Sequence, residues 1–181
     1  MFKINFSDNI NPDRFIKKRL RSRYVQELER LAKGVVYVGF PESAKNDEGL
    51  TIAKYARWNN YGTFSHDENG NTTSRIPARP FFTEGFFFEK YKERRQALAK
   101  ELIRMLRSGK ASYKDVLGMV GTEAVNNVRD AIQTGPWVPN APSTLARKLA
   151  KSKGKKAKEG VKPLIDTGDM IGAVTYKVEE Q

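Results

Sequence analysis

The sequence predicts an α+β fold in which a small antiparallel or mixed sheet packs against several helices, including a long helical hairpin. Three observations lead to this prediction. A few short segments alternate or are β-branched, longer segments carry apolar residues at helical spacing, and Gly or Pro ends most of these segments. A chain of 181 residues, 39% of them hydrophobic, has the size of one compact domain, so we expect a single domain over residues 1–181.

Three short segments carry the strand signal. Residues 2–6 alternate apolar and polar side chains, residues 35–40 form a β-branched run that Pro41 ends, and residues 173–178 alternate again. We expect the middle segment to lie inside the sheet beside the last one, with residues 2–6 as a further strand.

An N-terminal extension over residues 1–34 combines the first strand with a helix. Apolar residues recur at helical spacing from Pro12 to Lys33, Asn11 can cap this helix, and Gly34 follows its end. The extension therefore leads directly into the strand at residues 35–40.

Two long helices are predicted in the middle of the chain. The first covers about residues 83–108 and ends at Gly109. Ser112 can cap the second, which continues through Ile132 and is closed by Gly135-Pro136. Because only a few residues join them, the two helices should form an antiparallel hairpin.

The remaining segments are shorter. Helical spacing or turn chemistry predicts short helices over residues 51–60, over residues 144–150 and after the turn at Pro163. Residues 76–82 and 137–143 each contain two prolines, so both should be extended and stiff connectors. The polar stretch 64–75 contains an Asn-Gly turn signal and is expected to be a hairpin tip or a mobile loop.

The composition excludes much of enzyme chemistry. The chain has no cysteine and its only histidine is His66, so disulfides, Cys/His zinc sites and Cys/His nucleophiles are excluded within one chain. No apolar run approaches the ~20 residues needed to cross a bilayer. We therefore expect a protein made in the cytoplasm that is not an enzyme, uses no cofactor or metal, and has no membrane partner.

Positive charge is concentrated in one tract. Residues 147–162 hold eight Lys or Arg against one Glu, a contribution of +7 to the net charge of +12, and the tract is expected to be flexible. One interpretation is contact with DNA phosphates or with an acidic neighbouring surface; the other is a solvated loop. The candidate contact residues are Lys151, Lys153, Lys155, Lys156 and Lys158.

Residues Asp166-Thr167-Gly168 match the active-site tripeptide of aspartic proteases. Such an enzyme needs a pair of carboxylates from two such turns, and this chain offers one turn amid several helices. The alternative is that Asp166 caps a short helix that starts at Thr167, with Asp169 in its first turn. We adopt the helix cap as the interpretation.

Several strings, taken in order, resemble the phage virion morphogenesis and tail-completion proteins. The first three are residues 56–63 (Ala-Arg-Trp-Asn-Asn-Tyr-Gly-Thr), residues 76–81 (Ile-Pro-Ala-Arg-Pro-Phe) and residues 163–168 (Pro-Leu-Ile-Asp-Thr-Gly), followed by Met170 and a final strand. Gly135-Pro136-Trp137, Pro139 and residues 141–148 also resemble that family. The resemblance covers about Val35 to Val178, while the first 34 residues are less similar.

The resemblance implies a small α+β structural protein of a tailed bacteriophage virion, at the neck or tail end. Such a protein is a tail-completion or head-tail connector component that assembles as a ring, with portal, adaptor, tail terminator or tail tube proteins, and packaged DNA, as its partners. Because aromatic and Arg anchors dominate interface energetics, the expected subunit-interface residues are Trp58, Tyr61, Arg79, Phe81 and Trp137.

The charge of the chain leaves a rival function open. A basic nucleic-acid-binding module would contact DNA phosphates without sequence preference, and its affinity would fall steeply with salt. Salt-dependent binding of duplex DNA by the monomer would favour this rival over the virion structural protein.

Overall fold

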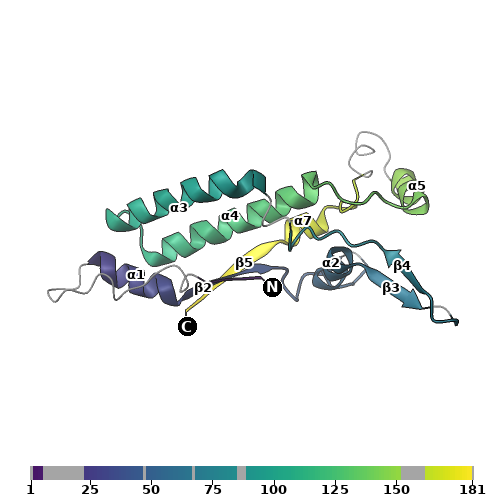
Figure 1. The fold of residues 1–181 in the computed structure, drawn as a ribbon, viewed down its shortest axis with the longest axis horizontal. Coiled ribbons are helices and arrows are strands. Elements are labelled where there is room, and N and C mark those ends of the chain that lie inside the picture. Colours follow the sequence, from purple (N-terminus) through teal and green to yellow (C-terminus); the bar gives the residue numbers. More distant parts are fainter. Residues whose placement is uncertain are drawn as a thin grey trace. The chain divides into compact units, whose positions relative to one another are not determined.

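The computed structural model describes residues 2–5, 23–46, 48–66, 68–84, 89–151 and 162–180, and its fold is α+β, as predicted (Figure 1). The chain divides into two compact units. Unit 1 comprises Met1–Gly39, Phe88–Val125 and Thr175–Gln181, and unit 2 comprises Phe40–Phe87 and Asn126–Val174.

The sheet of unit 1 has three antiparallel strands. They are β1 (Phe2–Asn5), β2 (Gly34–Gly39) and β5 (Thr175–Glu180), in the order β1-β2-β5. The register places Val38 opposite both Phe2 and Tyr176. The central strand β2 is the β-branched run, and its three valines are at most 1% exposed. The three predicted strands and the central place of the second one are thus confirmed.

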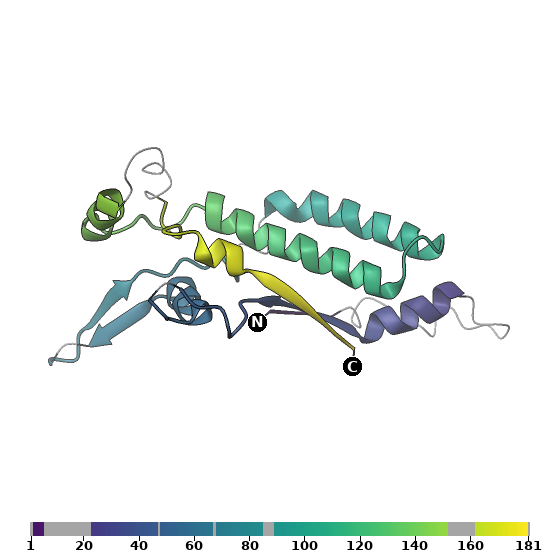
Figure 2. The same ribbon diagram turned by 180° about the vertical axis from the view of Figure 1, so that it is seen from behind.

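Four helical segments belong to unit 1. They are α1 (Arg23–Lys33), the 3-10 turn η4 (Glu89–Tyr91), α3 (Lys92–Arg107) and the first part of α4 (Tyr113–Thr134). Helix α3 and this part of α4 lie antiparallel and side by side in both ribbon views, which confirms the helical hairpin (Figures 1 and 2).

The hairpin helix α3 begins later than the predicted residue 83. Residues 81–84 form a turn in which the Glu84 N–H donates to the Pro80 carbonyl at 2.8 Å, and regular helix starts at Lys92. Residues 85–88 lie outside the described ranges, as do residues 6–22, which include the first half of the predicted first helix. The proline connector therefore continues into a turn and not directly into the long helix.

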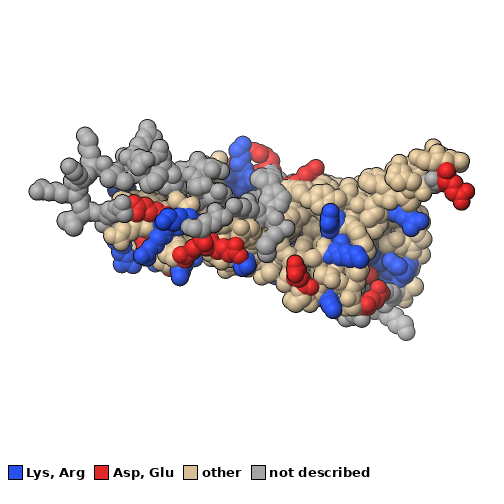
Figure 3. All heavy atoms as spheres, turned by 90° about the horizontal axis from the view of Figure 1, so that it is seen from below, with Lys and Arg blue, Asp and Glu red and all other residues tan. Residues whose placement is uncertain are grey.

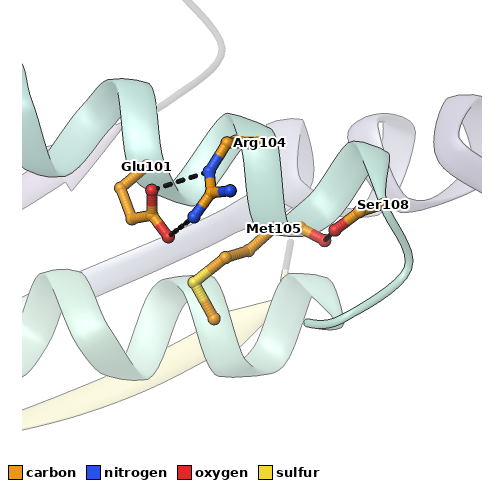
Figure 4. A network of polar contacts seen from close by, with 4 residues as sticks. All are labelled: Glu101, Arg104, Met105 and Ser108. Atoms are coloured by element: carbon orange, nitrogen blue, oxygen red, sulfur yellow. Dashed lines mark hydrogen bonds and ion pairs between the residues drawn. The ribbon is translucent and has the colours of Figure 1, made fainter.

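Local polar contacts fix the end of α3 and the start of α4. At the end of α3 the Ser108 hydroxyl donates to the Met105 carbonyl at 3.0 Å, one turn after an ion pair between Glu101 and Arg104 (Figure 4). Before α4 the Ser112 N–H and hydroxyl both donate to Asp115 at 2.8 Å, and the Asp115 N–H points back at the Ser112 hydroxyl. This reciprocal arrangement is a capping box and confirms the predicted cap at Ser112.

Two glycines allow close packing between the sheet of unit 1 and its neighbouring elements. A Cβ added at Gly34 would overlap the side chain of Leu117, which is fully buried. One added at Gly121 would overlap the ring of Tyr176. Helix α4 can therefore approach β2 and β5 only because these positions lack a side chain.

Replacing Gly121 by alanine is expected to lower the free energy of unfolding by about 1–3 kcal/mol, the usual cost of overpacking. The added methyl group would displace the Tyr176 ring, and this outweighs the gain of about 1 kcal/mol in helix propensity. Urea unfolding measures the change. Gly172→Ala in the short helix of unit 2 is the control, since its added Cβ would meet nothing within 4 Å. Equal loss of stability in both variants would contradict the close-packing explanation.

Unit 2 contains α2 (Ile52–Tyr61), the antiparallel hairpin of β3 (Thr63–His66) and β4 (Thr72–Ile76), α5 (Pro142–Lys151), α7 (Asp169–Ala173) and the last part of α4. The polar stretch 64–75 is thus a hairpin, one of the two forms predicted for it. The buried apolar residues of the unit are Ile52, Ala56, Phe81, Val128, Ala131, Ile132, Leu164, Met170 and Val174. Within the described part of the chain, no helix has both the length and the apolar character needed to cross a bilayer.

Candidate functional site

The candidate site is a groove of about 510 Å³ in unit 2. The strings at residues 56–63, 76–81, 135–148 and 163–168 belong to this unit, whereas the final strand of the resemblance is β5 of unit 1. Four segments of unit 2 that contain these strings supply part of the groove lining. They are the end of α2, the connector at residues 76–82, the start of α5 with the connector before it, and residues 163–168. Groove-lining residues from these segments include Asn59, Ile76, Pro77, Arg79, Asn140, Ala141, Thr144, Lys148, Pro163, Leu164 and Asp166.

Arg79 joins three of these segments through its guanidinium group. The Nε atom donates to the Val138 carbonyl at 2.7 Å, one Nη to the Pro139 carbonyl at 3.2 Å, and the other Nη to Asn59 Oδ1 at 3.3 Å. The side chain is only 4% exposed, and this burial lowers the pKa of Arg79 from its usual value. A guanidinium still remains charged at neutral pH, so the fork of N–H donors clasps the second connector to the first.

Lys148 plays a similar part on α5. It is 6% exposed, and its Nζ donates to the carbonyls of Lys162 (3.1 Å), Pro163 (3.5 Å) and Ile165. Burial lowers the pKa of Lys148, while the carboxylate of Asp166 acts in the opposite direction. Three donors of one ammonium thus meet three carbonyls, which holds the start of the 162–168 segment against α5.

Asn60 ties the end of α2 to the first connector. Its side chain is 4% exposed, and Oδ1 accepts the Phe82 N–H at 2.9 Å, while the Arg79 N–H donates to the Asn59 carbonyl at 2.8 Å. Sequence reasoning missed both Asn60 and Lys148. An Asn-Asn pair before a glycine was the available signal for Asn60. For Lys148 no such signal exists, because the apolar periodicity of the helix predicts that Leu149 is buried and Lys148 exposed, the reverse of what is found.

Tyr55 lines the groove, and its phenol is an unusually weak acid. Burial, with a smaller contribution from the carboxylate of Asp169, raises the pKa of Tyr55 to about 12. Between pH 10 and 12 the unfolded chain loses this proton and the folded chain keeps it. The stability linked to Tyr55 is therefore present below pH 10 and is lost as the pH rises toward 12.

An ultraviolet titration of the native protein tests this pKa. Subtracting the titration of Tyr55→Phe from that of the unmodified chain should leave one tyrosine step with a midpoint near 12. Asp169→Asn should move the midpoint down only in part, because burial is the larger cause. A step centred at the ordinary value of about 10 would contradict the burial of this phenol.

The predicted interface residues fall into two groups. Arg79 and Phe81 are 4% and 0% exposed, so both side chains lie inside the subunit and are not accessible to another copy. Tyr61 is 62% exposed, and Trp58 and Trp137 are half-buried. Lys54 lies 5.2 Å from the centre of the Trp58 ring, and the Trp137 indole donates to the Ala131 carbonyl at 2.7 Å. Of the five predicted interface residues, only Tyr61, Trp58 and Trp137 therefore have accessible side chains.

The predicted cap role of Asp166 is wrong. Helix α7 starts at Asp169, its cap residue is Gly168, and the Asp169 N–H donates to the Thr167 hydroxyl at 3.4 Å. The chain turns left-handed at Gly168, with φ +94°, and this turn delays the start of the helix. Asp166 instead lies exposed on the wall of the groove.

Four of the five predicted basic contact residues lie outside the described part of the chain. Lys153, Lys155, Lys156 and Lys158 lie outside the described residues, and of Lys151 only the backbone, at the end of α5, is described. Within the described ranges no three His, Asp or Glu side chains gather in a way that could hold a metal ion.

Comparison with family models, curated proteins and solved structures finds no match for this chain.

Proposed function

We propose that this chain is a structural protein of a tailed bacteriophage virion, a tail-completion or head-tail connector component that assembles as a ring. Its partners in this role are other copies of itself and the portal, adaptor, tail terminator or tail tube proteins of the neck. In this role the chain holds its neighbours in a fixed geometry and carries out no chemical reaction.

The clasp at Arg79 carries the proposal. The strings on which the resemblance rests are far apart in sequence, yet Arg79 bonds directly to Asn59, Val138 and Pro139 across them. Such a clasp holds two proline connectors in one fixed conformation. A preformed surface loses little conformational entropy when a partner binds, which suits a subunit that must join a ring.

Exposed apolar side chains on unit 2 also support an assembly role. Tyr61, Phe64, Val138 and Leu149 are between 43% and 64% exposed. Large apolar side chains that remain exposed are available for burial when another subunit binds.

The test uses purified virions of the phage whose genome encodes the chain. The chain should be present in mature particles, and antibody labelling in electron micrographs should place it at the neck or tail end. Deleting the gene should yield heads and tails that fail to join, or tails that remain incomplete. Absence of the polypeptide from mature particles, or turnover of a substrate by the purified chain, would overturn the proposal.

The net charge of +12 favours a second candidate, a basic module that binds DNA phosphates. Deleting residues 151–158 removes five lysines and should leave folding intact. A nucleic-acid module would lose most duplex affinity on this deletion, and the affinity of the intact chain would fall steeply with salt. A connector subunit that uses the tract only against DNA in the lumen would still join the particle.

A further inference from the structure

Helix α5 exposes its apolar side and buries a charge. Pro142, Ala146, Leu149 and Ala150 are all exposed, and their spacing places them on one side of the helix. The opposite side carries the buried Lys148. A helix at a protein surface normally shows the reverse pattern, with its polar side in water. The apolar side of α5 therefore has the character of a surface that another molecule covers.

The β3–β4 hairpin also leaves an apolar side chain exposed. It consists of two strands with little burial, and Phe64 is 64% exposed, with Tyr61 62% exposed three residues earlier. A two-stranded hairpin is marginal in water unless it packs against something. Figure 2 shows the hairpin extending away from α2, while Tyr61 ends α2 and Phe64 lies near the start of β3.

The base of the hairpin is nevertheless closely packed. Gly62 has φ +77°, and a Cβ there would lie 2.8 Å from the Ile76 carbonyl oxygen and 3.0 Å from the Ala78 nitrogen. The two strands thus meet the first connector with no room for a side chain, and the connector itself is held by Arg79. The direction of the hairpin is set by the subunit before any partner arrives.

Charge distinguishes the two surfaces. Glu68 is exposed at the hairpin tip, where Figure 3 shows acidic atoms at the end of the projection. Arg147 is exposed on α5 beside the apolar side. The hairpin thus has an acidic tip at Glu68, with the exposed Arg75 nearer its base on β4, whereas α5 has a basic residue, Arg147, at the border of its apolar side.

We propose that the β3–β4 hairpin of one copy docks on the apolar side of α5 in the next copy. Phe64 and Tyr61 cover Leu149 and its neighbours, and Glu68 approaches Arg147. Because the two surfaces differ, each copy offers one to the copy ahead and one to the copy behind, which is the head-to-tail interface that closes rings. The proposal rests on the ring assembly of the proposed function and names the surfaces that build it.

The cysteine-free chain makes this contact testable by disulfide cross-linking. Chains carrying Phe64→Cys and chains carrying Leu149→Cys are produced together, and both the particles and the concentrated purified protein are treated with a mild oxidant. We expect a covalent dimer of twice 20.5 kDa that contains one chain of each kind. Ile103→Cys on α3 replaces Leu149→Cys in the control, because Ile103 is also an exposed aliphatic residue, at 54% exposure against 43% for Leu149.

A charge exchange then identifies the partner as a copy of the same chain. Glu68→Arg or Arg147→Glu alone should lower the yield of cross-linked dimer about two- to fivefold, the usual range for an exposed pair. Combining both changes in every chain should restore the yield. Restoration is expected only if the hairpin meets α5 of another copy, so failure to restore the yield would contradict the Glu68–Arg147 pairing.

The outcomes separate this proposal from the proposed function. If the chain is present in particles but Phe64→Cys cross-links no better to Leu149→Cys than to Ile103→Cys, the docking is wrong and the connector role stands. If the chain is missing from particles, the connector role is wrong, and the cross-link in concentrated protein still decides whether hairpin and α5 meet. Cross-linked dimers made only of Phe64→Cys chains would overturn the head-to-tail arrangement.

Discussion

Replacing Phe81 by alanine is expected to lower the free energy of unfolding by about 3–5 kcal/mol, the usual cost of emptying a large aromatic site in a core. The Phe81 ring is fully buried, and the centres of the Phe40 and Phe82 rings both lie 6.4 Å from it in edge-on arrangements. Urea or thermal unfolding measures the loss.

Phe64→Ala is the matched control, because Phe64 is 64% exposed and its replacement should change stability by no more than about 0.5 kcal/mol. The pair also tests the interface prediction made for Phe81. If Phe81→Ala kept full stability and lost only ring assembly, the ring would act between subunits as the sequence suggested. A large loss of stability in the isolated chain assigns it to the core of unit 2.

Arg79→Met is expected to destabilise the protein by about 2–4 kcal/mol, because it removes a buried charged donor and leaves its acceptors without this partner. The acceptors are the carbonyls of Val138 and Pro139 and the amide oxygen of Asn59. Arg79→Lys should recover only part of the loss, since an ammonium cannot reproduce the planar fork. Amide exchange at Trp137, Val138 and Asn140 should become faster in both variants.

Arg75→Met provides the control for Arg79. Arg75 also lines the groove but is exposed, so its replacement should stay within about 0.5 kcal/mol of the unmodified chain. Should Arg79→Met prove as stable as Arg75→Met, with unchanged amide exchange at Trp137, Val138 and Asn140, the guanidinium clasp would not be what fixes the connectors.

Most elements of the fold follow from local signals that the sequence carries on its own. The β-branched run ended by Pro41 is the central strand β2, and Ser112 caps α4 three residues before Asp115. Helix α5 covers Pro142–Lys151, close to the predicted residues 144–150. These signals work because steric preferences and capping act within a few residues of chain.

The candidate site depends on contacts that local signals do not reveal. From the sequence Arg79 is predicted to lie in a subunit interface, yet its hydrogen bonds reach Val138, 59 residues further along the same chain. The cap assigned to Asp166 failed because Gly168 adopts a left-handed conformation, which the motif alone does not reveal.

The sequence by itself determined the α+β class, the order of the strands and helices, and the proline connectors. Only the tertiary structure decided which polar side chains lie inside, and it placed Lys148 in and Leu149 out on the same helix. The physical reason is that burial depends on which carbonyls and rings a side chain meets from distant segments. Secondary structure, in contrast, is largely fixed by neighbours along the chain.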